Sequence, residues 1–207
     1  MNRTIVAHTP LGSQLLFKKM LGTESVSNLF EFNITLVSQN PNLQGKDIIG
    51  QSVTLEIDTE ASNPRYLNGL VTDFGYIGED EDEEGYHAYT CTTRPFMWYL
   101  TQNTDSRVFV DKSVLDIANE VLAPFGFPYQ IKCQKGYRTR GFCVQYQENS
   151  FDFLNRLFEQ EGIYYYFAHS NGSHELVITD DVGVLEAISS PNIPYHSRNT
   201  APGAPNI

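Results

Sequence analysis

The sequence contains little cysteine, and its few cysteines are far apart. Cys91, Cys133 and Cys143 are the only three in 207 residues, and none forms a C-x-x-C pair. An odd number of widely spaced cysteines excludes a disulfide scaffold and favours reduced thiols. Cys91 lies in a strand-like stretch, so we expect it to be a small core residue. Cys133 and Cys143 flank a turn, and a hairpin that brings them face to face remains open.

Long apolar runs are also missing. No segment approaches the roughly 18 apolar residues of a membrane-spanning helix. The N-terminus, MNRTIVAHTPLGSQ, lacks the apolar centre of a signal peptide. We therefore expect a protein that is made in the cytoplasm without a signal peptide. Any secretion of it would use a pathway that does not depend on such a peptide.

Basic residues are scarce. The chain has 14 Lys and Arg against 25 Asp and Glu, a net charge of −11. A nucleic-acid partner is not expected, because phosphate neutralisation requires a basic face. Six of the acids form one run, residues 79–84, between two strand-like stretches. A solvated hairpin loop is favoured there; cation binding is the alternative, although the spacing of a calcium loop is absent.

Catalytic signatures are missing as well. The sequence has no G-x-S-x-G elbow, no phosphate-binding G-x-x-x-x-G-K-[ST] loop, no G-x-G-x-x-G fingerprint and no H-E-x-x-H pair. Glu159 and Glu161 show no pairing that marks a glycosidase. The sequence therefore predicts no enzyme, no catalytic or cofactor-binding residue and no cofactor.

Two histidines are the best metal candidates among the five. His169 and His174 bracket the Asn171-Gly172 turn and are expected to meet across its hairpin. Glu175 is the only nearby acid, whereas a metal site needs a third and usually a fourth ligand. Exposed turn histidines without a metal are therefore favoured.

A short basic segment allows a binding interpretation. It interleaves aromatic Tyr137 and Phe142 with four basic residues, Lys132, Lys135, Arg138 and Arg140. Such a segment resembles a small nucleic-acid patch. In an acidic chain, a solvated hairpin tip or a donor of salt bridges between subunits is favoured instead.

A second binding interpretation, a platform for carbohydrate, is possible for five aromatic residues: Phe125, Phe127, Tyr164, Tyr165 and Tyr166. Aromatic side chains more often fill a core or a subunit interface. Core or interface positions are therefore favoured for these five residues.

The most informative stretch is residues 150–167, SFDFLNRLFEQEGIYYYF. Ser150 is the expected N-cap, Asp152 suits the positive end of the helix dipole, and Gly162 ends the helix in a left-handed conformation. The spacing gives one apolar face, made by Phe151, Phe153, Leu154, Leu157 and Phe158. A strand at 163–167 and a hairpin turn into 176–179 follow.

The first half of the chain reads as strands separated by turns. Strands are expected at 14–20, 30–37, 53–58, 65–77 and 86–93, with alternating apolar residues in the second and third. Gly69 and Gly75 are expected to mark bulges or bends in the long strand. Meander-like connections without a long helix predict an antiparallel β-barrel.

After Pro95 the pattern changes. A short helix is expected at 95–102 with Trp98 as its large anchor, and Ser113 and Asp116 predict a capped helix that ends near Gly126. Residues 129–133 and 141–146 are expected to form a strand pair before the helix at 150. The prediction is a mainly β chain with a small α+β domain, whose helices lie on one face of an antiparallel sheet. We assign 1–97 to the barrel, 98–182 to the α+β domain and 183–207 to an extended connection that is the candidate to complete the barrel.

Five segments resemble the VgrG family in order and spacing: residues 29–43, 48–57, 65–74, 86–122 and 142–167. The family comprises the spike proteins of the bacterial type VI secretion system, related to the tail hubs of contractile phages. The resemblance covers residues from about 15 to 178, and the joint occurrence of RPFMW, DSRVF and EGIYYYF is its most specific part.

The resemblance implies a structural part and a barrel of the phage tail-hub type. Family members form homotrimers whose hub barrels cap the hexameric tube protein, and a β-helical needle carries a tip protein or effectors through a target membrane. Because full spikes continue far beyond Ile207, the chain is expected to be a truncated hub fragment. The tip protein, the effectors and the membrane would then be reached only through the missing part, and the type VI system would secrete the protein. The alternative is the baseplate hub of a prophage tail or another contractile injection particle.

Overall fold

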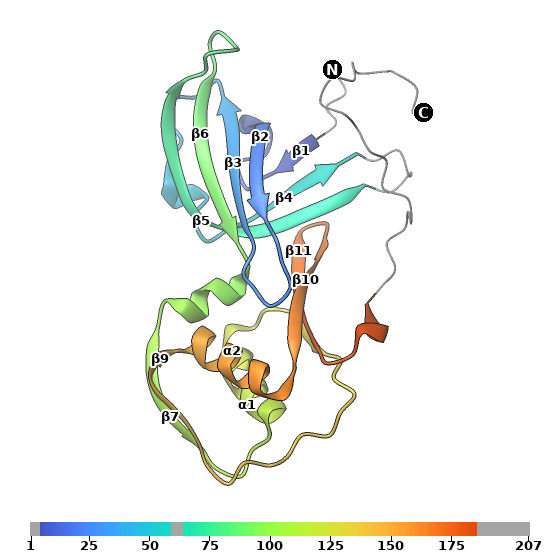
Figure 1. Ribbon diagram of the computed structural model, residues 1–207. Coiled ribbons are helices and arrows are strands. Elements are labelled where there is room, and N and C mark those ends of the chain that lie inside the picture. Colours follow the sequence, from blue (N-terminus) through green and yellow to red (C-terminus); the bar gives the residue numbers. More distant parts are fainter. Residues whose placement is uncertain (1–4, 59–63, 186–207) are drawn as a thin grey trace.

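In the computed structural model, residues 5–58 and 64–185 are described, and they form a mainly β structure (Figure 1). The upper part is one antiparallel sheet with strand order β1-β4-β5-β6-β3-β2. Its strands are β1 (Ile5–His8), β2 (Leu16–Thr23), β3 (Glu31–Ser38), β4 (Ser52–Ile57), β5 (Arg65–Glu79) and β6 (His87–Arg94). The predicted strands are all present, whereas β1 was not foreseen.

The alternation predicted for the second strand is confirmed in β3. Phe32, Ile34 and Leu36 are all less than 5% exposed, and they face the interior of the curved sheet. Gly69 in β5 has a different role from the predicted bulge: a Cβ atom there would lie 2.9 Å from Cβ of Thr93. Gly69 thus permits close packing, and the register of β5 against β6 shifts further along, after Val71 and after Tyr76.

The sheet curls into a half-barrel. Its two end strands, β1 and β2, lie near each other but are not hydrogen-bonded as neighbours. The segment expected to complete the barrel, 183–207, lies outside the described residues from 186 onward, so that expectation and the domain boundaries remain predictions.

The connection after β6 is a 3-10 helix, η3 (Phe96–Thr101), not an α-helix. Trp98 was expected to be its anchor, but Phe96, Met97 and Leu100 are the buried residues. The Trp98 ring instead lies under the guanidinium of Arg94, 5.4 Å from ring centroid to Cζ.

Two α-helices follow, α1 (Val114–Leu122) and α2 (Ser150–Glu161). Ser113 and Asp116 form the predicted capping box of α1. The cap of α2 is Asn149, whose side chain accepts a hydrogen bond from the backbone N–H of Asp152, and Ser150 is a buried first-turn residue. The expected Ser150 cap is therefore wrong by one position, while Gly162 ends the helix as predicted, at φ 68°.

The predicted strand pair 129–133 and 141–146 does not form. β7 (Thr104–Phe109) pairs with β9 (Cys143–Asn149), and β8 (Tyr129–Ile131) instead joins the predicted hairpin β10 (Tyr164–Ser170) and β11 (Ser173–Thr179). β8 lies parallel to β11, so this sheet is mixed. Cys133 follows β8 and Cys143 begins β9, which belong to different sheets, and all three cysteines are free. Cys91 is fully buried, as expected.

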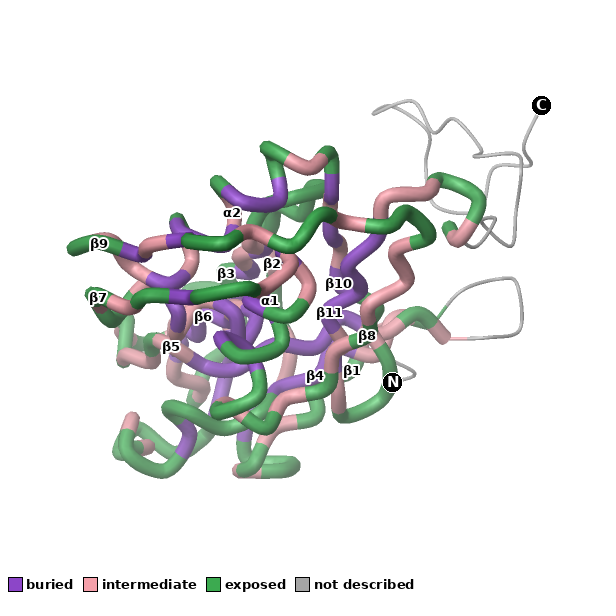
Figure 2. The backbone as a smooth tube through the Cα atoms, turned by 90° about the horizontal axis from the view of Figure 1, so that it is seen from below, coloured by how far each residue is buried: buried purple, intermediate pink, exposed green. Residues whose placement is uncertain are grey.

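The core is continuous between the two parts. Helix α2 packs its apolar residues inward, with Phe153 stacked on Phe109 of β7 at 5.5 Å between ring centroids. Figure 2 shows buried backbone concentrated in the interior, along β5, β6, β10 and β11. The tip of the β10–β11 hairpin reaches up to the large sheet, which creates a joint between the two parts (Figure 1).

Candidate functional site

The joint is built around the two predicted histidines. His169 and His174 face each other across the β10–β11 hairpin, as expected. They are not exposed turn residues, however. His174 is only 5% exposed, and the side chain of His169 is 7% exposed. The hairpin tip carries them into the large sheet, a tertiary contact that the local sequence does not encode.

His174 connects the large sheet with η3. Its Nε2 atom accepts a hydrogen bond of 3.0 Å from the backbone N–H of Phe96. Its Nδ1 atom lies 2.8 Å from the side-chain oxygen of Asn68 and donates to it, because that oxygen is an acceptor. Burial, with a smaller contribution from the neighbouring His169, lowers the pKa of His174 to about 4. His174 is therefore neutral at physiological pH.

Asn68 on β5 is the centre of the joint. Its backbone N–H donates to Nδ1 of His169 at 3.0 Å. Its side-chain amide donates to Ser52 and Thr54 on β4, at 2.8 and 2.7 Å. Strand β6 pairs with β5 only from Leu70 onward, so the imidazole takes the place of a neighbouring strand beside Asn68.

Further contacts surround the two imidazole rings. The ring of Phe30 lies 4.9 Å from that of His169 and 5.5 Å from that of His174, measured between centroids. On the other side, Nε2 of His169 lies 3.1 Å from the carboxylate of Glu24. A hydrogen-bonded joint with a buried centre fixes the orientation of the half-barrel relative to the helical part. The one feature of the sequence that could have indicated this joint is Asn68, a polar residue inside the apolar run YLNGLV.

The metal interpretation of the histidines finds no support in the geometry. Glu175 follows His174 directly in β11, so its side chain points to the opposite face of the sheet, where it accepts a hydrogen bond from Gln130. Among residues 5–58 and 64–185, no group of three His, Cys, Asp or Glu side chains has the arrangement of a metal site.

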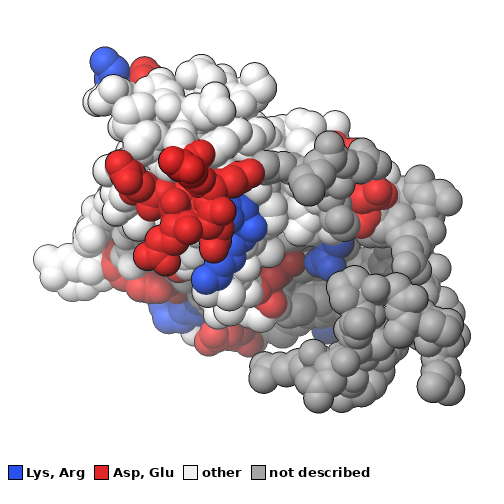
Figure 3. Space-filling model, turned by 90° about the horizontal axis from the view of Figure 1, so that it is seen from above, with Lys and Arg blue, Asp and Glu red and all other residues white. Residues whose placement is uncertain are grey.

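The acidic run forms the predicted β5–β6 hairpin loop. Figure 3 shows Asp and Glu side chains gathered densely on the face seen from above. The run is not uniformly solvated. Asp80 accepts hydrogen bonds from the backbone N–H groups of Asp82 and Glu83, and its side chain is only 2% exposed. The ammonium of Lys18 lies 2.5 Å from Asp80 and 2.7 Å from Asp82. The hydrogen bond from Lys18 is the main reason why the pKa of Asp80 is lowered.

The basic segment is neither a hairpin tip nor a continuous patch. The carboxylate of Asp180 holds it as a loop, accepting from the N–H groups of Gln134 and Lys135 and from the hydroxyl of Tyr137. The Tyr137 hydroxyl is the largest cause that lowers the pKa of Asp180 to about 2. Arg140 turns back to α2.

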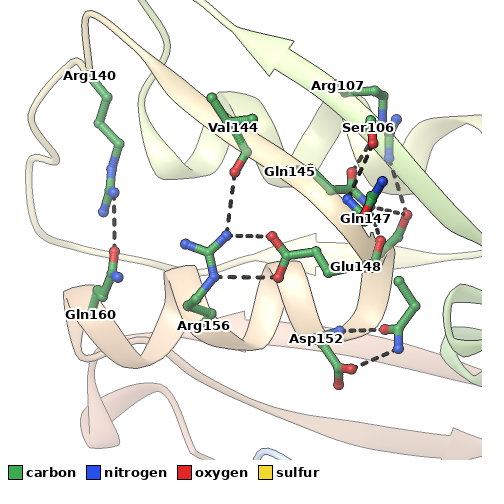
Figure 4. A network of polar contacts seen from close by, with 12 residues as sticks. Ser106, Arg107, Arg140, Val144, Gln145, Gln147, Glu148, Asp152, Arg156 and Gln160 are labelled. Carbon is green, nitrogen blue, oxygen red and sulfur yellow. Dashed lines mark hydrogen bonds and ion pairs between the residues drawn. The ribbon is translucent and has the colours of Figure 1, made fainter.

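Polar contacts attach α2 to its surroundings (Figure 4). Arg140 pairs with Glu161 at 2.5 Å and donates to Gln160 at 3.1 Å. Arg156 pairs with Glu148 at 2.5 Å and reaches the carbonyl oxygen of Val144 on β9. Arg140 and Glu161, both considered as binding or catalytic candidates from the sequence, therefore serve an intrachain contact.

The aromatic residues do not form a platform. Tyr165 is fully buried, with its ring centroid 6.2 Å from that of Phe158. Phe127 stacks on Phe96 at 4.6 Å. Tyr164 and Tyr166 point to the opposite side of β10 from Tyr165 and are half-buried. Tyr165 and Phe127 therefore pack in the core, as the favoured interpretation predicted.

One apolar groove of about 360 Å³ lies between the two end strands of the half-barrel. It is lined by β1, by the beginning of β2 and by the turn between them. His8, at its border, points to Glu56 of β4 at 2.7 Å. The groove lacks the convergent titratable groups of an active site.

In the described part of the chain, no helix has the length and apolar character needed to cross a bilayer.

The half-barrel and its joint with the helical part give the fold, and similarity to known proteins shows the family. Residues 23–206 match the family described as phage tail baseplate hub (GPD). The chain belongs to this family, which is one of structural hub and spike proteins and not of enzymes.

Relatives of the chain include spike proteins of the type VI secretion system. The chain is 36% identical over 199 residues to the spike protein VgrG1a of Pseudomonas aeruginosa, covering 95% of this chain and 30% of that protein. It is 34% identical over 199 residues to VgrG1b of the same species, covering 94% of this chain and 26% of that protein. The chain thus spans about a third or less of the length of these relatives.

Solved structures share the fold. The Escherichia coli c3393 protein, described as a type VI secretion component similar to the T4 phage tail proteins gp27 and gp5, superposes with a TM-score of 0.74 at 21% identity, over 89% of this chain and 51% of that one. A 43 kDa tail protein of prophage MuSo2 from Shewanella oneidensis gives 0.54 at 17% identity, over 86% of this chain and 52% of that one. The predicted family and fold class are confirmed.

Proposed function

We propose that this chain is the N-terminal hub region of a type VI secretion spike. In this proposal, three copies assemble into a hub that caps the hexameric tube protein and connects it to a membrane-puncturing needle. The observation that carries the proposal is the similarity to VgrG1a, which extends over 95% of the chain. Tip proteins, effectors and the target membrane would be engaged by parts beyond this region, and the assembled spike would be secreted.

The joint gives the proposal a mechanical basis. A hub that transmits the thrust of a contracting sheath must keep its barrels in a fixed orientation. Asn68 and His174 form buried hydrogen bonds across the boundary between the half-barrel and the helical part. Buried and fully satisfied polar networks of this kind favour a single, rigid arrangement. We accordingly propose residues 1–97 and 98–182 as two domains that move as one body.

The second candidate is the baseplate hub of a prophage tail or another contractile injection particle. It is favoured by the name of the matching family, phage tail baseplate hub, and by the shared fold of the MuSo2 tail protein. The two candidates share an architecture and differ in the tube that they cap.

Co-purification tests the proposal and separates the candidates. The protein is tagged and expressed together with the type VI tube protein or, in parallel, with the prophage tail-tube protein of the same genome. We expect a stable complex with the type VI tube protein, and its presence in the culture medium of secreting cells. A complex with the prophage tube protein alone would favour the second candidate, and binding to neither would overturn both.

A further inference from the structure

Each imidazole of the joint accepts a hydrogen bond from a backbone N–H group. Nδ1 of His169 accepts from Asn68, and Nε2 of His174 accepts from Phe96, both at 3.0 Å. A ring nitrogen accepts a hydrogen bond only while it carries no proton. Because a neutral ring keeps one proton, His169 carries it on Nε2 and His174 carries it on Nδ1. The closed joint therefore requires both rings to be neutral and to hold opposite tautomers.

A second proton on either ring removes an acceptor from the joint. On His174 the new N–H would face the N–H of Phe96, and on His169 it would face the N–H of Asn68. The two ring centroids are 6.2 Å apart, so two imidazolium cations would also repel each other in a buried site. Acid therefore acts on the hydrogen bonds that attach the tip of the β10–β11 hairpin to β5 and η3.

His174 is surrounded by uncharged groups. The rings of Phe30 next to β3, Phe96 of η3 and Phe167 of β10 pack on it, at 5.5, 5.7 and 6.0 Å between centroids. Its partner on β5 is the amide of Asn68. None of these described contacts is a carboxylate. A proton on His174 would thus be buried without a counter-charge, which favours any arrangement that exposes the ring to water.

The carboxylates of the surrounding elements lie elsewhere. Glu24, between β2 and β3, lies 3.1 Å from Nε2 of His169 and would stabilise an imidazolium there. Glu175 of β11 is on the opposite face of its sheet, and Glu56 of β4 pairs with His8. In the described residues, His169 is thus the ring with a carboxylate partner. His174 is the acid-sensitive ring of the joint.

Other hydrogen bonds hold the base of the hairpin. The N–H of Ser27, between β2 and β3, donates to the carbonyl oxygen of Tyr165 in β10 at 2.8 Å. The hydroxyl of Ser27 accepts from the N–H of Tyr165 at 3.4 Å. These backbone and hydroxyl groups do not titrate in mild acid. The tip, residues 168–175, can therefore leave the large sheet while the contact at Ser27 remains.

We propose that His169 and His174 form an acid-sensitive latch between the half-barrel and the helical part. At neutral pH both rings are neutral, the latch is closed and the two parts move as one body. In mild acid a proton on His174 breaks the hydrogen bond from Phe96 and releases the hairpin tip, while both parts stay folded. The inference goes beyond the proposed hub function and is tested on the chain alone.

Hydrogen exchange of single backbone amides, followed by NMR, tests the latch. The protection factors of the Asn68 and Phe96 amides are measured at about pH 7.5 and about pH 5. The pKa of His174 is about 4 in the closed state and returns to 6.5 when the ring is exposed, so opening is favoured by about 30-fold at the lower pH. We expect the protection of both amides to fall by about that factor. Unchanged protection at either amide would overturn the proposal.

Reference amides distinguish opening of the latch from unfolding of the whole chain. Ile34 in β3 and Ile117 in α1 are buried residues, one in the half-barrel and one in the helical part. Because the latch opens without unfolding these elements, the joint amides should be at least about 10-fold less protected than the reference amides at the lower pH. Equal protection would show that the joint opens only with global unfolding, and the latch would be refuted.

The variant His174→Gln tests which group responds to acid. Glutamine retains a donor and an acceptor but does not titrate, so the pH effect on the Asn68 and Phe96 amides should be largely lost. The matched control is His87→Gln, at the start of β6 beside the acidic loop, which should retain the full effect. An effect of equal size in His174→Gln and wild type would overturn the proposal.

A measurement on the wild type keeps the test decisive if His174→Gln folds poorly. The nitrogen chemical shifts of the imidazole rings report which ring nitrogen carries the proton. At neutral pH we expect the proton of His174 on Nδ1 and that of His169 on Nε2. A proton on Nε2 of His174 at neutral pH would contradict the closed latch and overturn the proposal.

Discussion

Nδ1 of His174 lies 2.8 Å from the side-chain oxygen of Asn68, and this contact joins the hairpin of the helical part to the central strand of the half-barrel. Both groups are buried, at 5% and 1% exposure. Because Asn68 lies in β5 and His174 in β11, their polar atoms link two structural units.

Replacement of Asn68 by alanine removes the centre of the joint. The variant leaves His174 and Thr54 without their partner in a buried site, so we expect the free energy of unfolding to fall by about 2–4 kcal/mol. Urea denaturation measures the change. Asn103→Ala, at an exposed position between η3 and β7, is the control and should change it by less than about 0.5 kcal/mol. A loss of similar size in both variants would contradict the role of the joint.

The buried imidazole predicts a loss of stability in mild acid. The pKa of His174 is about 4 in the folded protein and 6.5 in the unfolded chain. Between these values the unfolded chain binds more protons, so stability is complete above pH 6.5 and falls as the pH approaches 4. The full contribution is about 3 kcal/mol.

This pH effect is isolated by comparing wild type with His174→Gln. The free energy of unfolding of each is measured from pH 7 to pH 4, and the wild type is expected to lose more of it than the variant. The carboxylates titrate equally in both proteins and cancel in the difference. Parallel pH profiles would refute the neutral, buried state of His174.

Lysine 18 is expected to order the acidic loop without governing global stability. Removing it in Lys18→Ala leaves Asp80 and Asp82 without their cation, so backbone amides of 80–86 should exchange with solvent faster while the melting temperature changes little. Hydrogen-exchange mass spectrometry measures this, with Lys19→Ala as the control. Because the pKa of Asp80 is lowered, the contact is present at neutral pH and lost on acidification. Unchanged exchange in Lys18→Ala would show that the loop is ordered by its own backbone bonds.

The cap of α2 provides a local test. Asn149→Ala should cost about 1 kcal/mol of stability, because one backbone N–H of the first turn loses its acceptor. Asn149→Asp retains an acceptor and should restore most of that stability. Thermal unfolding of the two variants decides between Asn149 and the neighbouring Ser150: equal stability of Asn149→Ala and wild type would exclude Asn149 as the cap.

The sequence predicts local structure well where short-range rules act. The alternation around Ile34, the capping box of Ser113, the left-handed Gly162 and the turn at Asn171-Gly172 all have causes within a few residues. The order of strands and helices predicted an antiparallel barrel with a small α+β domain, and the resemblance to the spike family specified a barrel of the tail-hub type.

Short-range sequence rules could not predict which strands pair or which distant residues come into contact. Residues 129–131 and 143–146 have ordinary strand patterns, yet nothing local indicates that β8 pairs with β11 and β9 with β7. His174 resembled an exposed turn histidine because its burial depends on β5 and η3, which are far away in sequence. The partnership of Lys18 with the acidic loop spans 62 residues and left no local signal either.

Native mass spectrometry of the protein mixed with the type VI tube protein tests the central claim, a structural hub, most directly. We expect a complex in which three copies of the protein bind one hexameric ring. A protein that remains a free monomer beside intact tube rings would contradict the claim.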